Sequence, residues 1–236
     1  MSPPRHRPGV RRRVLPVLLA VGLAAGCSSA ADGTGPAAPA ALALPGTGER
    51  VLFFGDSYTA GYGATSDDEA FPARTAAAFG WVADVTAGPG TGFVAEGGVG
   101  RDYLEQLADL DVEPPALVVL QGGLNDAFAD PDAATERDAA TEVLAALADR
   151  FPGTPVVLFG PPLVPSLPDD SVRRVDRALD RAAAGAGAWY VSPVQDGWDV
   201  ASRLTDDDLH PGDEGHAHLA RELVAALRAL DGRSPR

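Results

Sequence analysis

The sequence predicts an α/β fold of three layers, α/β/α, in which helices cover both faces of a five-stranded parallel sheet. Short apolar runs, each of the length of a buried strand, recur at residues 51–54, 81–85, 116–120, 156–159 and 188–191. Amphipathic helical patterns lie between and after these runs. Strands that alternate with helices are typical of one domain built around a parallel sheet.

The first apolar run, Val-Leu-Phe-Phe at residues 51–54, ends abruptly in Gly55, Asp56 and Ser57. The glycine permits a sharp exit from the strand, which leaves Ser57 at its carboxyl end. Open α/β sheets carry their chemistry at that edge, so Ser57 is a candidate nucleophile. A Gly-Asp-Ser tripeptide is also common in plain turns, and the assignment therefore requires partners elsewhere in the chain.

Two further stretches follow the second and third predicted strands. Residues 88–92 read Gly-Pro-Gly-Thr-Gly, and residues 121–126 end in Asn125 and Asp126. Glycines expose backbone N–H groups, and Asn125 offers a neutral amide, so both stretches suit an oxyanion hole. A phosphate-binding loop is disfavoured because dinucleotide spacing and a P-loop lysine are both absent. Either stretch could also be only a turn, and Asn125 could cap a helix.

Three helices are predicted in the second half of the chain, at residues 131–150, 171–184 and 214–230, each with its apolar side chains on one face. We expect Asp130 to cap the first of them, with Pro131 at its first helical position.

Histidine is scarce, which narrows the search for a general base. Beside His6 near the amino terminus, the chain holds His210, His216 and His218. His216 and His218 fall on the last helix and point about 200° apart, so a shared zinc site is disfavoured. His210 precedes that helix in a loop, and Asp207, three residues earlier, can accept its ring N–H. The alternative is a loop imidazole that bonds to the backbone, and for Asp206 and Asp208 a solvated position is expected.

These motifs together resemble, in order, the four blocks of the SGNH (GDSL-type) hydrolase family, over residues 51 to about 230. The four matching stretches are Gly55-Asp56-Ser57, a glycine of residues 88–92, Gly123-Leu124-Asn125-Asp126 and Asp207-Asp208-Leu209-His210. The resemblance implies a flavodoxin-like sheet and a serine esterase that needs no metal or other cofactor. It makes Ser57 the nucleophile, His210 the general base and Asp207 the acid that orients it. The oxyanion hole would comprise the Ser57 N–H, a glycine N–H and the Asn125 amide.

Two departures from the family pattern affect the details. Tyr58 stands where the family has the leucine that gives the GDSL name, and the second block lacks the asparagine often found before its glycine. Three glycines therefore compete for the oxyanion role, and we select Gly90. Tyr58 and Phe93 are predicted to contact substrate, with Tyr62, Phe128 and Trp198 as further aromatic candidates. The domain has no long insertion to form a lid, so we expect an open, shallow site that favours short acyl chains such as acetyl.

The amino-terminal residues predict export. Five arginines and no acids precede a short apolar run that ends before Cys27, the only cysteine in the chain. Residues 1–26 are expected to be a lipoprotein signal peptide, exported by the Sec or the twin-arginine route, with a lipid on Cys27. The alternative is ordinary secretion with a free thiol. Residues 27–48, rich in alanine, proline and glycine, are expected to form a disordered tether, followed by the hydrolase domain at 49–232 and a tail at 233–236.

The negative net charge of the chain limits the kinds of partner that it can bind. The net charge of -14 falls to -19 when the five arginines of residues 1–26 are removed, which disfavours a nucleic-acid partner. We expect a monomer that acts on a small-molecule, glycan or lipid ester, held by its lipid anchor at the outer face of the cytoplasmic membrane, or else secreted. The alternatives are a surface lipoprotein that binds acylated cell-wall glycans without turnover, and a lysophospholipase or thioesterase of the same family.

Overall fold

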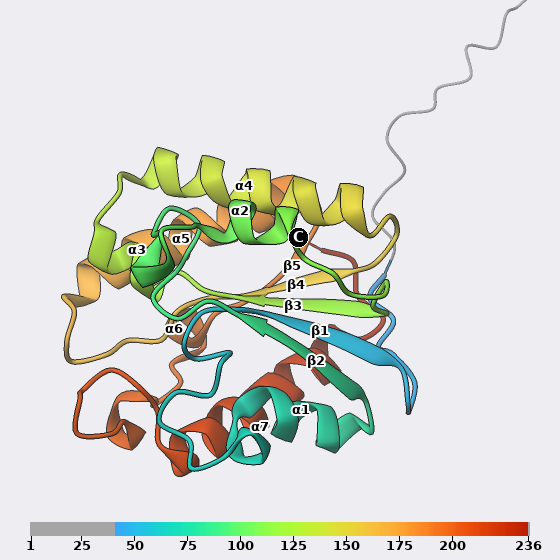
Figure 1. The fold of residues 1–236 in the computed structure, drawn as a ribbon, viewed down its shortest axis with the longest axis horizontal. Helices are drawn as coiled ribbons and strands as arrows, with labels where there is room; N and C mark the ends of the chain where they lie inside the picture. Colours follow the sequence, from blue (N-terminus) through green and yellow to red (C-terminus); the bar gives the residue numbers. More distant parts are fainter. Residues whose placement is uncertain (1–40, 236) are drawn as a thin grey trace, which may run out of the picture. The chain divides into compact units, whose positions relative to one another are not determined.

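The computed structural model describes residues 41–235, and its sheet has five strands (Figure 1). All strand pairs are parallel and the order is β2-β1-β3-β4-β5, which confirms the predicted sheet and is the flavodoxin-like order. The strands are β1 (Arg50–Gly55), β2 (Val82–Ala87), β3 (Leu117–Gln121), β4 (Val156–Phe159) and β5 (Trp189–Val191). The expected signal peptide, Cys27 and most of the expected tether lie outside the described residues.

Helices cover both faces of the sheet, as expected for three layers. Figure 1 shows α2, α3, α4 and α5 on one face and α1 with α7 on the other. Their bounds are α1 (Phe71–Phe79), α2 (Tyr103–Ala108), α3 (Leu124–Ala129), α4 (Ala133–Arg150), α5 (Asp169–Ala186), α6 (Pro193–Asp196) and α7 (Asp213–Leu230). Short 3-10 turns occur at η1 (Asp67–Glu69), η2 (Gly97–Val99) and η3 (Ala201–Arg203).

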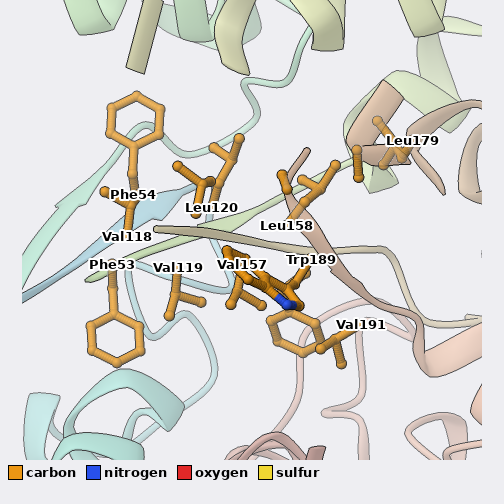
Figure 2. Packing of buried hydrophobic residues seen from close by; sticks show 14 of the residues in the cluster. Phe53, Phe54, Val118, Val119, Leu120, Val157, Leu158, Leu179, Trp189 and Val191 are labelled. Atoms are coloured by element: carbon orange, nitrogen blue, oxygen red, sulfur yellow. The ribbon is translucent and has the colours of Figure 1, made fainter. Parts of the chain in front are cut away.

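The core packs against both faces of the central strands. Phe53 and Phe54 point to opposite faces of β1, as period-two alternation requires (Figure 2). Phe53 lies in register with Val119 of β3, and Phe54 with Leu120. All four side chains are fully buried, so packing on both faces fixes the position of β1. The turn that follows β1 is therefore held in a defined position.

The edge strand β2 corrects one prediction. Residues 81–85 were expected to form a buried strand, but Val82 is 43% and Val85 50% exposed. The reason is position: β2 pairs with β1 on one side only and ends the sheet. Local sequence does not distinguish such an edge strand from a central one.

The start of α4 is also corrected. Its N-cap is Asp132, whose carboxylate accepts the N–H groups of Ala134 and Thr135 at 2.9 Å each. Asp130, the predicted cap, instead ends the preceding helix α3 in a left-handed conformation with φ 57°. Pro131 therefore lies in the connection between two helices.

The domain begins earlier than the predicted boundary at residue 49. Leu42 is 1% exposed, its N–H donates to the Arg233 carbonyl, and its own carbonyl accepts the Gly232 N–H, both at 2.7 Å. Trp81 donates its indole N–H to the Pro45 carbonyl at 2.9 Å. Residues 41–48 thus pack against the domain and its carboxyl-terminal tail.

Within the described residues, no helix combines the length and the apolar character needed to cross a membrane.

Candidate active site

Ser57 lies in the turn that leaves β1 at the carboxyl edge of the sheet. Gly55 makes this turn possible, because a Cβ there would lie 2.4 Å from the Thr59 hydroxyl and 2.7 Å from the Gln121 carbonyl. Ser57 itself is 7% exposed. The tight turn stays close to the end of β3, and Ser57 is largely buried at the carboxyl edge of the sheet.

A hydrogen-bonded chain joins Ser57, His210 and Asp207. Oγ of Ser57 lies 3.0 Å from Nε2 of His210, and Nδ1 of His210 lies 2.6 Å from Oδ2 of Asp207. If the proton of the neutral imidazole is on Nδ1, it is donated to Asp207 and leaves Nε2 as an acceptor toward the serine. The fold therefore brings the three side chains predicted from the sequence together in one series of hydrogen bonds.

The loop before α7 holds Asp207 in place. Its Oδ1 accepts the N–H groups of Leu209 and His210 at 2.9 and 2.8 Å, and the hydroxyl of Thr205 at 2.8 Å. Desolvation would raise the pKa of Asp207, but the hydrogen bonds from His210, Leu209 and Thr205 outweigh it, so the pKa is lowered from its ordinary value. Asp207 is thus ionised and oriented as an acceptor for the imidazole. Asp206 and Asp208 are exposed, as expected for solvated residues.

Among Gly88, Gly90 and Gly92 of the loop after β2, one glycine has a backbone N–H without an acceptor in residues 41–235. The Gly88 N–H donates to the Gly55 carbonyl at 2.9 Å and the Gly92 N–H to the Ala95 carbonyl at 2.8 Å. The N–H groups of Gly90 and Ser57 donate to no acceptor within residues 41–235. The hydrogen-bond pattern therefore favours Gly90 among the three competing glycines.

Asn125 lies at the start of α3 and faces the same loop. Its Nδ2 donates to the Thr91 carbonyl at 2.9 Å and lies 3.4 Å from Oδ2 of Asp56. The second contact is at the long end for a hydrogen bond, so one N–H of the amide is only weakly held. Asn125 can therefore offer that N–H to a ligand beside Ser57.

Asp56, directly before the candidate nucleophile, is a buried carboxyl. It is 1% exposed, accepts the Tyr58 N–H at 2.9 Å and lies 3.3 Å from the side-chain amide of Gln121. Burial raises its pKa to about 7, against the opposing effect of these hydrogen bonds. Gln121 also accepts the Thr59 hydroxyl at 2.8 Å, and so ties the turn to the end of β3. Gln121 could not be identified as a site residue from the sequence, because a polar residue at the end of an apolar strand carries no motif of its own.

The predicted substrate contacts Tyr58 and Phe93 are corrected. Both are 2% exposed; the Tyr58 hydroxyl donates to the Leu209 carbonyl at 2.6 Å, and the Phe93 ring packs edge-on against Tyr103. Each ring belongs to the packing behind the site, because its tertiary neighbours cover it. Neither is open to a substrate.

Two other aromatic side chains are exposed instead. Tyr62 is 50% exposed and its ring centroid lies 5.4 Å from that of His210. Phe128 is 47% exposed and follows Asn125 by three residues in α3, which puts the two on the same face of the helix. Tyr62, beside His210, and Phe128, on the same face of α3 as Asn125, are therefore exposed aromatic side chains near the proposed site residues.

The remaining histidines have separate surroundings. His216 is fully buried; its Nδ1 accepts the Phe71 N–H at 3.3 Å and its Nε2 donates to the Tyr62 carbonyl at 2.9 Å. His218 faces Glu222 at 3.6 Å. In the described part of the chain, no group of three His, Cys, Asp or Glu residues is arranged to hold a metal ion.

Comparisons with known proteins identify the family of the chain. A family model described as the GDSL-like Lipase/Acylhydrolase family matches residues 53–218. A protein of Mycobacterium tuberculosis named as a GDSL lipase is 29% identical over 191 residues, which cover 75% of this chain and 80% of that protein.

Solved structures share the fold. The structure of TesA matches with a TM-score of 0.62 at 23% identity, over 77% of this chain and 99% of that one. A family two carbohydrate esterase from Cellvibrio japonicus matches with a TM-score of 0.62 at 21% identity, over 80% of this chain and 63% of that one. A member of the lipolytic G-D-S-L family from Veillonella parvula matches with a TM-score of 0.60 at 17% identity, over 77% and 99%.

Proposed function

The chain belongs to the GDSL-like lipase/acylhydrolase family of ester hydrolases, and from this premise we propose that it is an exported serine esterase acting through an acyl-enzyme. The observation that carries the proposal is the chain of hydrogen bonds from Ser57 to His210 at 3.0 Å and from His210 to Asp207 at 2.6 Å. A serine hydroxyl is a weak nucleophile unless an adjacent base takes its proton as it attacks.

The proposed reaction has two steps. His210 Nε2 accepts the Ser57 proton while Oγ attacks the ester carbonyl, and the resulting imidazolium then protonates the departing alcohol. Water, deprotonated by the same imidazole, attacks the acyl-serine and releases the carboxylic acid. Asp207 keeps its carboxylate on Nδ1 throughout, which stabilises the imidazolium and fixes the ring.

The oxyanion of each tetrahedral intermediate is proposed to lie between three donors. These are the backbone N–H groups of Ser57 and Gly90 and the side-chain amide of Asn125. The absence of competing acceptors for the two N–H groups within residues 41–235 supports this assignment. Fixed donors of this kind stabilise charge that develops only in the transition state.

A short acyl chain, such as acetyl, is the preferred substrate in this proposal. Two cavities of the domain lie away from the proposed nucleophile, so neither provides an acyl channel beside Ser57. One is lined by residues at the amino ends of the strands, among them Ala116, Pro155 and Trp189, and the other by residues of β5, α6 and α7. A long acyl chain needs an apolar channel beside the serine, whereas an acetyl group does not.

A panel of p-nitrophenyl acetate, butyrate, decanoate and palmitate tests this function. The proteins compared are wild type, Ser57→Ala and the control Ser66→Ala, in which an exposed serine of the same loop makes no helix-capping bond. We expect hydrolysis that falls with chain length, loss of nearly all turnover in Ser57→Ala, and full activity in Ser66→Ala. Binding of an acylated glycan without turnover by wild type would instead favour the non-catalytic lipoprotein.

Export and anchoring are part of the same proposal. The arginine-rich segment, the apolar run and the single cysteine at position 27 support a lipoprotein that stands as a monomer at the outer face of the cytoplasmic membrane. Labelling of cells with a palmitate analogue should mark the wild-type chain and not the Cys27→Ser variant. A labelled variant, or an unlabelled wild-type chain in the culture medium, would contradict the anchor.

A further inference from the structure

Asp126 follows the proposed oxyanion donor Asn125 and is fully buried in α3. Its carboxylate accepts three backbone N–H groups from the loop after β2. Oδ2 accepts that of Phe93 at 3.1 Å, and Oδ1 accepts those of Val94 at 2.8 Å and Ala95 at 2.9 Å. One side chain of α3 therefore holds three successive residues of another element.

The loop is shaped to admit this carboxylate. A Cβ on Gly92 would lie 2.3 to 2.6 Å from the carboxyl atoms of Asp126. The φ angle of Gly92 is not in the left-handed region, so this glycine is required for space and not for its backbone conformation. Asp126 and Gly92 thus form a matched pair, in which the missing side chain of one admits the carboxylate of the other.

The contact between Gly92 and Asp126 lies next to two of the proposed oxyanion donors. Gly90 precedes Gly92 by two residues, and Asn125 is adjacent to Asp126 in α3. The Asn125 amide adds a fourth tie, since it donates to the Thr91 carbonyl at 2.9 Å. The distance between the Gly90 N–H and the Asn125 amide therefore depends on how tightly the loop is held to α3.

We propose that Asp126 is a positioning residue that holds the Gly90 N–H and the Asn125 amide at the spacing an ester oxyanion requires. This inference rests on the proposed esterase function. Displacement of catalytic groups by about 1 Å can cost about 10²-fold in rate. Three N–H groups on one carboxylate are a strong restraint against such displacement, because charge-assisted hydrogen bonds are about twice as strong as neutral ones.

The test compares Asp126→Asn with Asp176→Asn. Asp176 is a matched control, because it is 1% exposed and its carboxylate also accepts three hydrogen bonds, from Tyr190, Ser192 and Gln195, on the side of β5 and α6. An asparagine at either position replaces one acceptor oxygen by an NH₂ that faces donors. Both variants should therefore melt at lower temperature than wild type.

Only Asp126→Asn should impair turnover. We expect its kcat for p-nitrophenyl acetate to fall about 10- to 100-fold at a KM within about twofold of wild type, since a transition-state interaction is lost. Asp176→Asn should retain kcat within about twofold. Equal losses of kcat in both variants, or an unchanged kcat in Asp126→Asn, would overturn the inference.

A second pair of variants tests the contact without changing the carboxylate. Gly92→Ala should lower kcat as Asp126→Asn does, whereas Gly185→Ala, where a Cβ meets nothing within 4 Å, should not. The double variant Gly92→Ala with Asp126→Asn should be no slower than the slower of the single variants Gly92→Ala and Asp126→Asn, because both changes break one contact. Additive losses would show that the two residues act separately.

The outcomes distinguish failure of the proposed function from failure of this inference. A wild-type chain that hydrolyses no ester would overturn both. An active wild type, together with a Gly92→Ala variant of unchanged kcat, would overturn the inference alone.

Discussion

Oγ of Ser57 and Nε2 of His210 lie 3.0 Å apart, although 153 positions separate the two residues in the chain. Two nearby contacts hold their loops together. The Tyr58 hydroxyl donates to the Leu209 carbonyl at 2.6 Å, and Gly63 packs so closely on Pro211 that a Cβ would lie 2.2 Å from its carbonyl oxygen. The alignment of serine and imidazole is thus built by packing between the loop after β1 and the loop before α7.

Asp207→Asn should lower kcat by about 10²- to 10⁴-fold. The asparagine amide can turn its NH₂ toward Nδ1, which stabilises the wrong tautomer of the imidazole and removes the negative charge that supports the imidazolium. The neighbouring variant Asp208→Asn is the control, because Asp208 is exposed with φ 55° and asparagine tolerates that left-handed conformation. Steady-state kinetics with p-nitrophenyl acetate measures both. Equal activity of the two variants would contradict the role of Asp207.

Asn125→Ala should reduce kcat by about 10²- to 10³-fold with little change in KM, because one donor to the oxyanion is removed. The variant also loses the bond to the Thr91 carbonyl, so circular dichroism and a thermal melt must accompany the kinetics. Thr205→Val is a useful comparison, since it removes a single hydrogen bond to Asp207 and leaves the oxyanion donors intact. A rise in KM at constant kcat in Asn125→Ala would show that the amide binds ground-state substrate instead.

Tyr62→Ala should raise KM for esters of bulky alcohols and spare those of methanol. Its exposed ring lies 5.4 Å from the ring of His210, the residue proposed to protonate the departing alcohol. An aromatic contact contributes about 0.5–1.5 kcal/mol, which corresponds to roughly a 2- to 12-fold change in KM. Steady-state kinetics with naphthyl acetate and methyl acetate compares an ester of a bulky alcohol with an ester of methanol. Val85→Ala is the control, because it removes an equally exposed side chain from the edge strand. The same KM change for both esters would argue against a rim contact.

Glu136→Gln should stabilise the protein above neutral pH. Glu136 in α4 is 1% exposed, and within the described residues both its carboxylate oxygens lack a hydrogen-bond partner. Burial, with the nearby Asp126, raises its pKa to about 9, although Arg174 acts in the opposite direction. The unfolded chain releases this proton near pH 4.5, so the stability of the wild type falls as pH rises from about 4.5 to 9 and is level outside that window.

Glutamine carries no charge in either state, which removes this fall. Thermal melts at pH 5, 6.5 and 8 should show Glu136→Gln close to wild type at pH 5 and above it by a margin that widens with pH, to several degrees at pH 8. The exposed Glu142 of the same helix supplies the control variant Glu142→Gln, which should follow wild type at each pH. Parallel curves for wild type and Glu136→Gln would contradict a buried, protonated Glu136.

Site residues could be predicted from the sequence where a local pattern or a scarce residue type indicates them. Gly55 ends an apolar run and so locates the turn at Ser57, while the small number of histidines directs attention to His210. The parallel sheet followed from five apolar runs separated by helical patterns, and the structure confirms it.

Features that depend on distant neighbours could not be predicted. Tyr58 and Phe93 are aromatic residues beside the motifs, and only the tertiary structure shows that they are buried, with the Tyr58 hydroxyl bonded to the Leu209 carbonyl and the Phe93 ring packed against Tyr103. β2 has the composition of an inner strand and is exposed because of its place in the sheet order. Leu42 stands in a stretch rich in alanine and proline, and its bonds to residues at the far end of the chain show that it is part of the packed domain.

Labelling by a fluorophosphonate ester tests the central claim, that Ser57 is a nucleophile activated by His210, most directly. The reagent phosphonylates an activated serine with loss of fluoride, and mass spectrometry of the digested protein locates the adduct. We expect one adduct per chain on the peptide that contains Ser57, none in Ser57→Ala, and labelling slowed by at least about 10²-fold in His210→Ala. An adduct on another residue, or equal labelling of wild type and Ser57→Ala, would contradict the account.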